Sequence, residues 1–301
     1  MISNPNQVVR FDWAMKHLLR DKANFDILEG FLCALLPEDV EILEILESES
    51  DQELAHLKYN RVDILVKNTL GEHIIIEVQN QHEAYYLQRL LFGTSKLIVE
   101  QLDLGQDYGN VAKVISISIL YFNMGRGDDY VYHGKTEFRG LHNDTPLKLR
   151  KRTETDGEIR YPNVNEGREI FPEYYLIQVE RFEDEIKSPL DEWIYMLKND
   201  TVREDFRSKN IDKARRKLNV MNMEEERRRR YEKYLMLLMS ERTVLADAEK
   251  KGLKQGLEQG LEQGERKKQL EIAHNMLKAG MSHEQISAIT GLSHEEVDNV
   301  T

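Results

Sequence analysis

The chain has 301 residues, and its 42 Lys and Arg against 54 Asp and Glu give a formal net charge of −12 at pH 7. Hydrophobic residues make up 40% of the sequence, which is enough for a packed core and excludes a disordered chain. The single cysteine, Cys33, excludes an internal disulfide framework and a cysteine-based zinc cluster. Since neither a signal-peptide pattern nor a membrane-length apolar run occurs, we expect a cytoplasmic protein without a membrane partner.

The first 125 residues predict helices and strands in alternation. Apolar spacing, turn residues and β-branched runs place the elements. In chain order, they are a helical segment over residues 11–36, a strand over 40–46, a hairpin of strands 61–67 and 73–79, a helix over about 83–102 and a buried strand over 114–122. This order predicts an α/β fold with a mixed sheet flanked by helices.

The remainder of the chain changes from strands to helices. Short strands are expected at residues 130–132 and 174–179, where they extend the sheet, and the pattern from residue 190 to about 247 is helical. We therefore expect an all-helical C-terminal region after the α/β core. The predicted division is a core over 1–188, a helical extension over 189–247, a glycine-repeat helix or linker over 248–268 and a small helical tail over 269–301.

Glycine recurs every fourth residue at Gly252, Gly256, Gly260 and Gly264. Each glycine costs about 1 kcal/mol relative to alanine inside a helix, so a helix here needs a compensating reason. The segment is either a flexible linker or a helix whose smooth stripe lets another helix approach closely.

The tail after the glycine repeat predicts two short helices around Gly280 and a third from Ser293. Their lengths suit a helix-turn-helix, but the tail carries few basic residues. We therefore favour self-association or capping over DNA reading for this segment, and expect a homo-oligomer formed through the C-terminal helical region.

The alternation of side chains in the two predicted hairpin strands provides a check on how they pair. If Lys67 faces His73 across the five-residue connection, Ile64 faces Ile76 and Asp63 faces Glu77. Because side chains alternate between the faces of a strand, one face is then apolar and the other presents two carboxylates in opposition. Like charges that face each other across strands are destabilising unless a counter-charge offsets them.

A divalent cation is one such counter-charge. Mg²⁺ prefers oxygen ligands and is commonly bound by one or two carboxylates together with water, and Gln79 lies on the same face, two residues after Glu77. The alternative is an acidic patch on a solvated sheet face, neutralised by Arg61 and Lys67. The spacing alone favours neither.

The segment from Asp63 to Glu77-Val78-Gln79 resembles the PD-(D/E)XK nuclease signature, in the variant with Gln in place of Lys. More narrowly, the chain is similar to the Rpn-type recombination-promoting nuclease and transposase family. The resemblance is carried by residues 11–19, 63–79, Arg89, 105–108, 114–122 and the glycine-repeat tail. It implies a restriction-endonuclease-like core.

The resemblance also assigns roles. Asp63 and Glu77 match the metal-binding acids, Gln79 matches the position that orients the attacking water, and Asp12 matches an acid that can join the metal shell. An ordinary acid at a helix N-terminus is the other reading of Asp12. The expected phosphate or DNA contacts are Arg89, Arg61 and Lys16, although Arg89 also suits a structural salt bridge.

The implied function is a Mg²⁺- or Mn²⁺-dependent DNA endonuclease associated with recombination, transposition or phage defence. Because Gln79 cannot accept a proton as a lysine amine can, we expect slow turnover. Two alternatives stay open: a catalytically idle scaffold that binds DNA or assembles through the helical tail, and an oligomeric regulator whose tail controls a partner.

Overall fold

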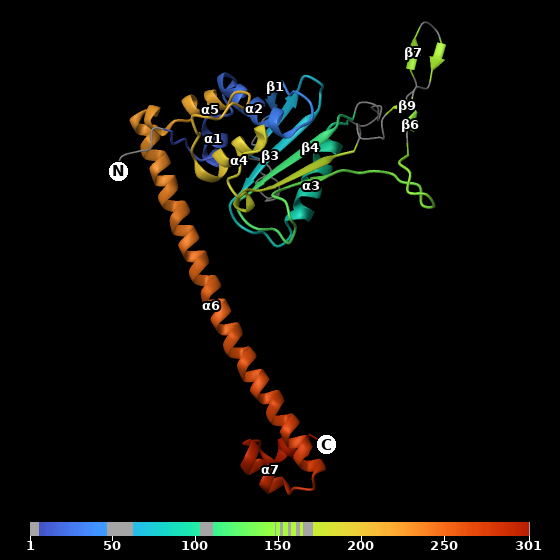
Figure 1. Ribbon diagram of the computed structural model, residues 1–301, viewed down its shortest axis with the longest axis vertical. Helices are drawn as coiled ribbons and strands as arrows, with labels where there is room; N and C mark the ends of the chain where they lie inside the picture. Colours follow the sequence, from blue (N-terminus) through green and yellow to red (C-terminus); the bar gives the residue numbers. More distant parts are fainter. Residues whose placement is uncertain are drawn as a thin grey trace. The chain divides into compact units, whose positions relative to one another are not determined.

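The computed structural model describes residues 6–46, 63–102, 111–147 and 171–300, together with residues 149–150, 153–155, 158–160 and 163–164. These residues divide between two compact units, Met1–Arg228 and Arg229–Thr301. The first unit is built on a six-stranded sheet of order β1-β2-β3-β4-β10-β5 (Figure 1). Its strands are β1 (Ile42–Leu46), β2 (Ile64–Asn68), β3 (His73–Gln79), β4 (Val114–Leu120), β5 (Val131–Gly134) and β10 (Glu173–Gln178).

The sheet is mixed, as the sequence predicts. Strands β1, β2 and β3 are antiparallel, β4 is parallel to both β3 and β10, and β5 closes the far edge antiparallel to β10. Two small antiparallel pairs lie outside this sheet. They are β6 (Leu149–Arg150) with β9 (Asn163–Val164) and β7 (Thr153–Thr155) with β8 (Glu158–Arg160).

The predicted hairpin register is confirmed over four pairs, from Lys67 with His73 to Ile64 with Ile76. The burial of β2 follows the predicted alternation. In β3, Ile74, Ile76 and Val78 are buried and Glu77 is partly exposed, but Ile75 on the other face is buried too. The paired ladder stops one residue before Asp63, which lies in a bend.

Helices cover both faces of the sheet. Figure 1 shows α1, α2, α4 and α5 on one side and α3 on the other. Their bounds are α1 (Phe11–His17), α2 (Phe25–Leu35), α3 (Tyr86–Glu100), α4 (Pro189–Asn199) and α5 (Ile211–Lys217), with short 3₁₀ helices η1 (Lys22–Asn24), η4 (Val179–Arg181) and η5 (Val220–Asn222). Phe31 of α2 packs edge-on against Trp193 of α4, with 6.2 Å between ring centroids. The fully buried Trp193 shows that α4 belongs to the core of this unit.

The single helical segment predicted over residues 11–36 is wrong, because the chain breaks between α1 and α2. The Asp21 carboxylate accepts a hydrogen bond from the Ala23 N–H, and the Asn24 amide donates to the Leu18 carbonyl. These short polar side chains satisfy backbone groups outside a helix and so compete with its continuation.

The first unit extends to Arg228, beyond the boundary at residue 188 that the sequence suggests. Helix α2 contacts both α4 and α5, so the helices after residue 188 share its core. At Gly30 a Cβ atom would clash with the Lys209 carbonyl and the Trp193 ring, so only glycine allows α2 to approach them this closely. The four-part division of the chain stays a prediction.

The glycine repeat lies within one helix, α6 (Glu225–Lys278), which runs for 54 residues. The structure thus favours the helical alternative over the linker for residues 248–268. A Cβ atom added at Gly252, Gly256, Gly260 or Gly264 would meet no heavy atom within 4 Å, so packing inside the described chain does not require glycine there. Among the described helices, none is both long and apolar enough to span a membrane.

The second unit ends in the short helices that the sequence predicts. Helices α7 (His283–Thr290) and α8 (His294–Asp298) each begin with a capping box, at Ser282 and Ser293. Gly280 lies in the turn between α6 and α7, and Gly291 lies in the turn between α7 and α8; both have a left-handed backbone conformation. A small core joins these helices to the end of α6 through Ala273, Ile286, Leu292 and Val297.

We predict that Gly256→Ala and Gly260→Ala each slow amide hydrogen exchange in the middle of α6 by about fivefold. Alanine favours a helix by about 1 kcal/mol over glycine, and no neighbouring atom opposes the added methyl group. Gly291→Ala is the control, because its φ of 73° disfavours a side chain and the change should destabilise the α7–α8 turn. Faster exchange in the Gly256 and Gly260 variants would contradict a continuous helix.

Candidate metal and nucleic-acid site

The side chain of Asp63 takes a main-chain hydrogen bond of β3 at the point where the pairing of β2 with β3 ends. Its carboxylate Oδ2 accepts a hydrogen bond from the Val78 N–H at 2.7 Å, where a main-chain acceptor would otherwise continue the pairing. Burial raises the pKa of Asp63, and the Asp12 charge raises it further, whereas the Val78 N–H, Lys16 and Arg20 lower it. The carboxylate therefore lies at the end of β3, in a setting that resists its negative charge.

Glu77 projects from β3 toward α3. Its Oε2 lies 3.5 Å from Arg89 Nη2, and only 13% of the side chain is exposed. Burial raises the pKa of Glu77 to about 7, with Arg89 opposing this shift and the charges of Asp63 and Glu83 adding to it. The negative charge of Asp63 therefore contributes to the raised pKa of Glu77.

Three cations surround the two acids. Lys16 on α1 acts electrostatically on Asp63, and Arg20 Nη2 donates to the Asp63 carbonyl at 3.0 Å. Arg89 on α3 pairs with Glu77 and also with Glu83, with its Nε 3.3 Å from Glu83 Oε2. Lys16 and Arg89 were expected from the sequence, whereas Arg61 lies outside the described residues.

Gln79 is the last residue of β3 and pairs with Leu120 of β4. It is partly exposed, and it lies on the same face as Glu77 because two residues separate them along the strand. Its carbonyl accepts a hydrogen bond from the Tyr121 N–H at 2.9 Å. The main chain at Gln79 is therefore held between β3 and the end of β4.

Asp12 is buried, with 4% of its surface exposed, and its charge raises the pKa of Asp63. Its Oδ2 accepts a hydrogen bond from Asn80 Nδ2 at 2.9 Å, and its Oδ1 accepts from the Trp13 N–H at 2.8 Å. Arg10 forms an ion pair with the same carboxylate at 3.4 Å. Asp12 thus links α1 to the residue that follows Gln79.

Sequence reasoning missed four polar residues around the acids: Arg20, Asn80, Tyr86 and Ser118. Tyr86 lies beneath Arg89, whose guanidinium carbon is 5.1 Å from the ring centroid, and burial raises the pKa of its phenol. Ser118 pairs with Glu77 in the sheet register and is fully buried. The sequence signal for Ser118 was a serine inside the apolar run of β4, but Ser116 gives the same signal and is also buried.

The donor set fits a hard divalent cation of the Mg²⁺ type. The two acids offer only oxygen, and both have raised pKa values, so a positive charge between them relieves an unfavourable arrangement. In the part of the chain that the structure describes, no group of three or more His, Cys, Asp and Glu residues has the arrangement of a metal site. The fit is therefore to an ion held by two carboxylates and water, which is common for Mg²⁺.

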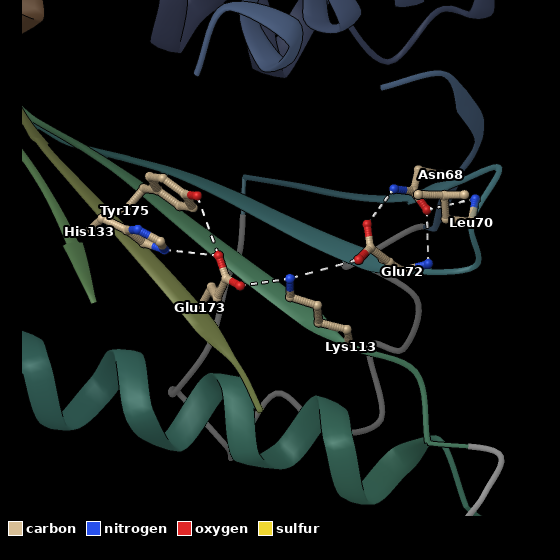
Figure 2. A network of polar contacts seen from close by, with 7 residues as sticks. All are labelled: Asn68, Leu70, Glu72, Lys113, His133, Glu173 and Tyr175. Atoms are coloured by element: carbon tan, nitrogen blue, oxygen red, sulfur yellow. Dashed lines mark hydrogen bonds and ion pairs between the residues drawn. The ribbon is translucent and has the colours of Figure 1, made fainter. Parts of the chain in front are cut away.

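A polar pocket of about 780 Å³ lies away from the acids, at the opposite end of the sheet. Its central carboxylate, Glu173, lies 2.8 Å from Lys113 Nζ and 2.9 Å from His133 Nε2, and Figure 2 shows how Lys113 also reaches toward Glu72. Lys113 and His133 lower the pKa of Glu173, although burial opposes them. This network joins four strands or their turns and is balanced internally, which indicates a structural role.

Two comparisons with protein families match the chain. Residues 9–149 match the model described as a PD-(D/E)XK nuclease family transposase, and residues 266–301 match the C-terminal helix-turn-helix domain of the Rpn/YhgA-like nuclease family. No curated protein and no solved structure gives a significant match. The second match identifies the tail as a helix-turn-helix, a motif associated with DNA binding. From the sequence alone, we had favoured self-association or capping over DNA reading for this segment.

We predict that the metal-free protein loses stability through Glu77 as the pH rises from about 4.5 to about 7. Because the pKa is raised on folding, the stabilising contribution is complete below the unfolded value and is lost above the folded one. The raised pKa changes the free energy of unfolding by about 3 kcal/mol at most across this pH range. Urea unfolding of Glu77→Gln should show a flatter pH dependence than the wild type.

Glu83→Gln is the matched control, because Glu83 also pairs with Arg89 but is 44% exposed. It should keep most of the wild-type dependence. If Glu77→Gln and Glu83→Gln behave alike between pH 5 and pH 8, the raised pKa of Glu77 is wrong.

Proposed function

Because the chain belongs to the Rpn-type family of PD-(D/E)XK nucleases, we propose that it is a metal-dependent DNA endonuclease of the cytoplasm. The observation that carries the proposal is the pair of partly buried acids with raised pKa values, Asp63 just before β2 and Glu77 near the end of β3. Two partly desolvated carboxylates beside cations are an arrangement that costs stability without a ligand. The reaction is hydrolysis of a phosphodiester bond.

Mg²⁺ or Mn²⁺ is the proposed cofactor, held by Asp63 and Glu77. When bound, such an ion lowers the pKa of water and offsets the charge that develops on the phosphate. The chain fixes the acids from two directions, since the Val78 N–H orients Asp63 and Arg89 holds Glu77. Asp63 is also constrained through its main chain, because its carbonyl accepts from Arg20.

Gln79 is proposed to orient the attacking water by hydrogen bonding. A side-chain amide offers one acceptor oxygen and two N–H donors, but it does not take up a proton at neutral pH. The proton released by the water therefore passes to solvent or to the phosphate, and not to Gln79. This favours the slow turnover that the Gln variant predicts.

Lys16, Arg20 and Arg89 are proposed to contact DNA phosphates beside the scissile bond, with Arg61 as a further candidate. Lys16 is exposed on α1, and the Arg89 side chain is 23% exposed, so both reach solvent next to an acid. With a net charge of −12, the whole chain repels DNA, and these local cations must supply the attraction. Recombination, transposition or phage defence is the proposed biological setting.

We further propose that two copies of the chain pair through α6. Leu253, Leu257 and Leu261 are 75%, 64% and 60% exposed along the glycine repeat, which is unusual for a helix face that stays in water. The adjacent glycines leave open space in which a second helix can approach. An antiparallel pair centred on Leu257 places Leu253 of one copy opposite Leu261 of the other.

We predict that Mg²⁺ or Mn²⁺ supports nicking of supercoiled plasmid by the wild type and that Asp63→Ala or Glu77→Ala lowers the rate by more than about 100-fold. Removing one acid removes half of the proposed protein ligands, and even indirect partners of a metal are worth about 10- to 100-fold. Calorimetry should show the same loss in Mg²⁺ affinity. Undiminished nicking in both variants would reject the site, and a wild type without metal-dependent nicking would favour the idle scaffold.

We predict that Leu257→Lys converts the paired protein to a monomer, measured as solution mass by light scattering. Burying a leucine side chain contributes about 1.5–3 kcal/mol, and both copies in the pair lose it, so the change should weaken pairing by about 100-fold or more. Gln259→Lys adds the same charge on the opposite side of the helix and should leave the mass unchanged. If the protein without residues 248–301 keeps the oligomeric state of the wild type, the pairing surface lies elsewhere.

A further inference from the structure

Asp12 and Asn80 form a buried polar link between α1 and the end of β3. Asn80 Nδ2 donates to Asp12 Oδ2 at 2.9 Å, and Asn80 Oδ1 accepts from Arg10 Nη2 at 2.9 Å. Arg10 is 7% exposed and also forms an ion pair with Asp12. The carboxylate, the amide and the guanidinium therefore contact one another in a triangle.

Two members of the triangle connect to Gln79: Asn80 follows it in the chain, and Arg10 stacks on Tyr121, which bonds to it. The Gln79 carbonyl accepts from the Tyr121 N–H at 2.9 Å. The guanidinium of Arg10 lies over the Tyr121 ring, 4.6 Å from the centroid. A continuous circuit of contacts thus runs from Asp12 through Asn80, Gln79 and Tyr121 back to Arg10.

The Asp12 carboxylate has little capacity for a metal ion. A carboxylate offers about four lone-pair sites. The Trp13 N–H and Asn80 occupy one oxygen each, and Arg10 lies 3.4 Å from Oδ1 and 3.5 Å from Oδ2. A cation at Asp12 would compete with these three donors, and displacing one would leave a buried donor unsatisfied, which costs about 1–3 kcal/mol.

We propose that Asp12 is a positioning residue that holds Gln79 through Asn80, and that it is not a ligand of the metal. This inference rests on the proposed function, because it takes Gln79 as the residue that orients the attacking water. Asp12 anchors the Asn80 amide, Asn80 fixes the main chain beyond Gln79, and the Gln79 side chain starts from a fixed Cα. Its charge also acts on Asp63, but from outside the metal shell.

An exchange of the two side chains separates positioning from metal binding. In Asp12→Asn the two amides present donors to each other or to Arg10, whichever way they turn, and in Asn80→Asp two carboxylates face each other. In the double variant, Asn at position 12 donates to Asp at position 80, and Arg10 keeps an anionic partner. The exchange therefore restores the triangle while moving the carboxylate to the other side chain.

We expect each single variant to lower kcat for plasmid nicking by about 10-fold or more, with KM for DNA and the calorimetric Mg²⁺ affinity within about threefold of the wild type. The double variant should recover kcat to within about threefold. A double variant as slow as Asp12→Asn, with Mg²⁺ affinity lowered by more than 10-fold in both, would show that Asp12 is a ligand and overturn the proposal.

Amide hydrogen exchange at Tyr121 gives a readout that does not need activity. Its N–H is bound to the Gln79 carbonyl, so exchange should be faster in each single variant and return to the wild-type rate in the double variant. If the wild type does not cleave DNA, the proposed function fails while this test still decides the positioning. Unchanged exchange in the single variants would overturn the link between Asp12 and Gln79.

Discussion

The hydrogen bond from the Val78 N–H to the Asp63 carboxylate determines the geometry of the candidate site. It replaces the next rung of the β2–β3 ladder, so the strand pairing ends at Ile64 and Ile76. A side chain that would otherwise point away from the strand is thereby fixed against the main chain of β3. Because Glu77 precedes Val78, this hydrogen bond fixes the acid just before β2 to the residue after the acid of β3.

This proximity has an energetic cost that the surrounding residues reduce but do not remove. Arg89 opposes the shift at Glu77, and Lys16 and Arg20 oppose it at Asp63, yet both pKa values remain raised. The glutamate of the opposite network differs, since Lys113 and His133 lower the pKa of Glu173 despite its burial. The comparison separates an internally balanced network from one that is incomplete without a further positive charge.

The sequence predicted the hairpin and the acids because both depend on local, periodic features. The alternation of apolar and polar residues predicted the correct register, and the predicted ladder ran only one residue too far, to Asp63. The same alternation placed Glu77 and Gln79 on one face. The break between α1 and α2 was missed because Asp21 and Asn24 bind backbone groups that a helical periodicity does not register. Asn80 and Arg20 were missed because each acquires its role from a residue far away in the chain.

The C-terminal match raises a question of charge that the structure helps to resolve. A helix-turn-helix needs cations for the DNA backbone, yet residues 279–301 contain no Lys or Arg, while α8 carries Glu295, Glu296 and Asp298. The basic residues of the matched segment are Arg266, Lys267, Lys268 and Lys278, all on α6, and Arg266 pairs with Glu296. Within the matched segment, the Lys and Arg side chains available for phosphate contacts therefore all lie at the end of α6.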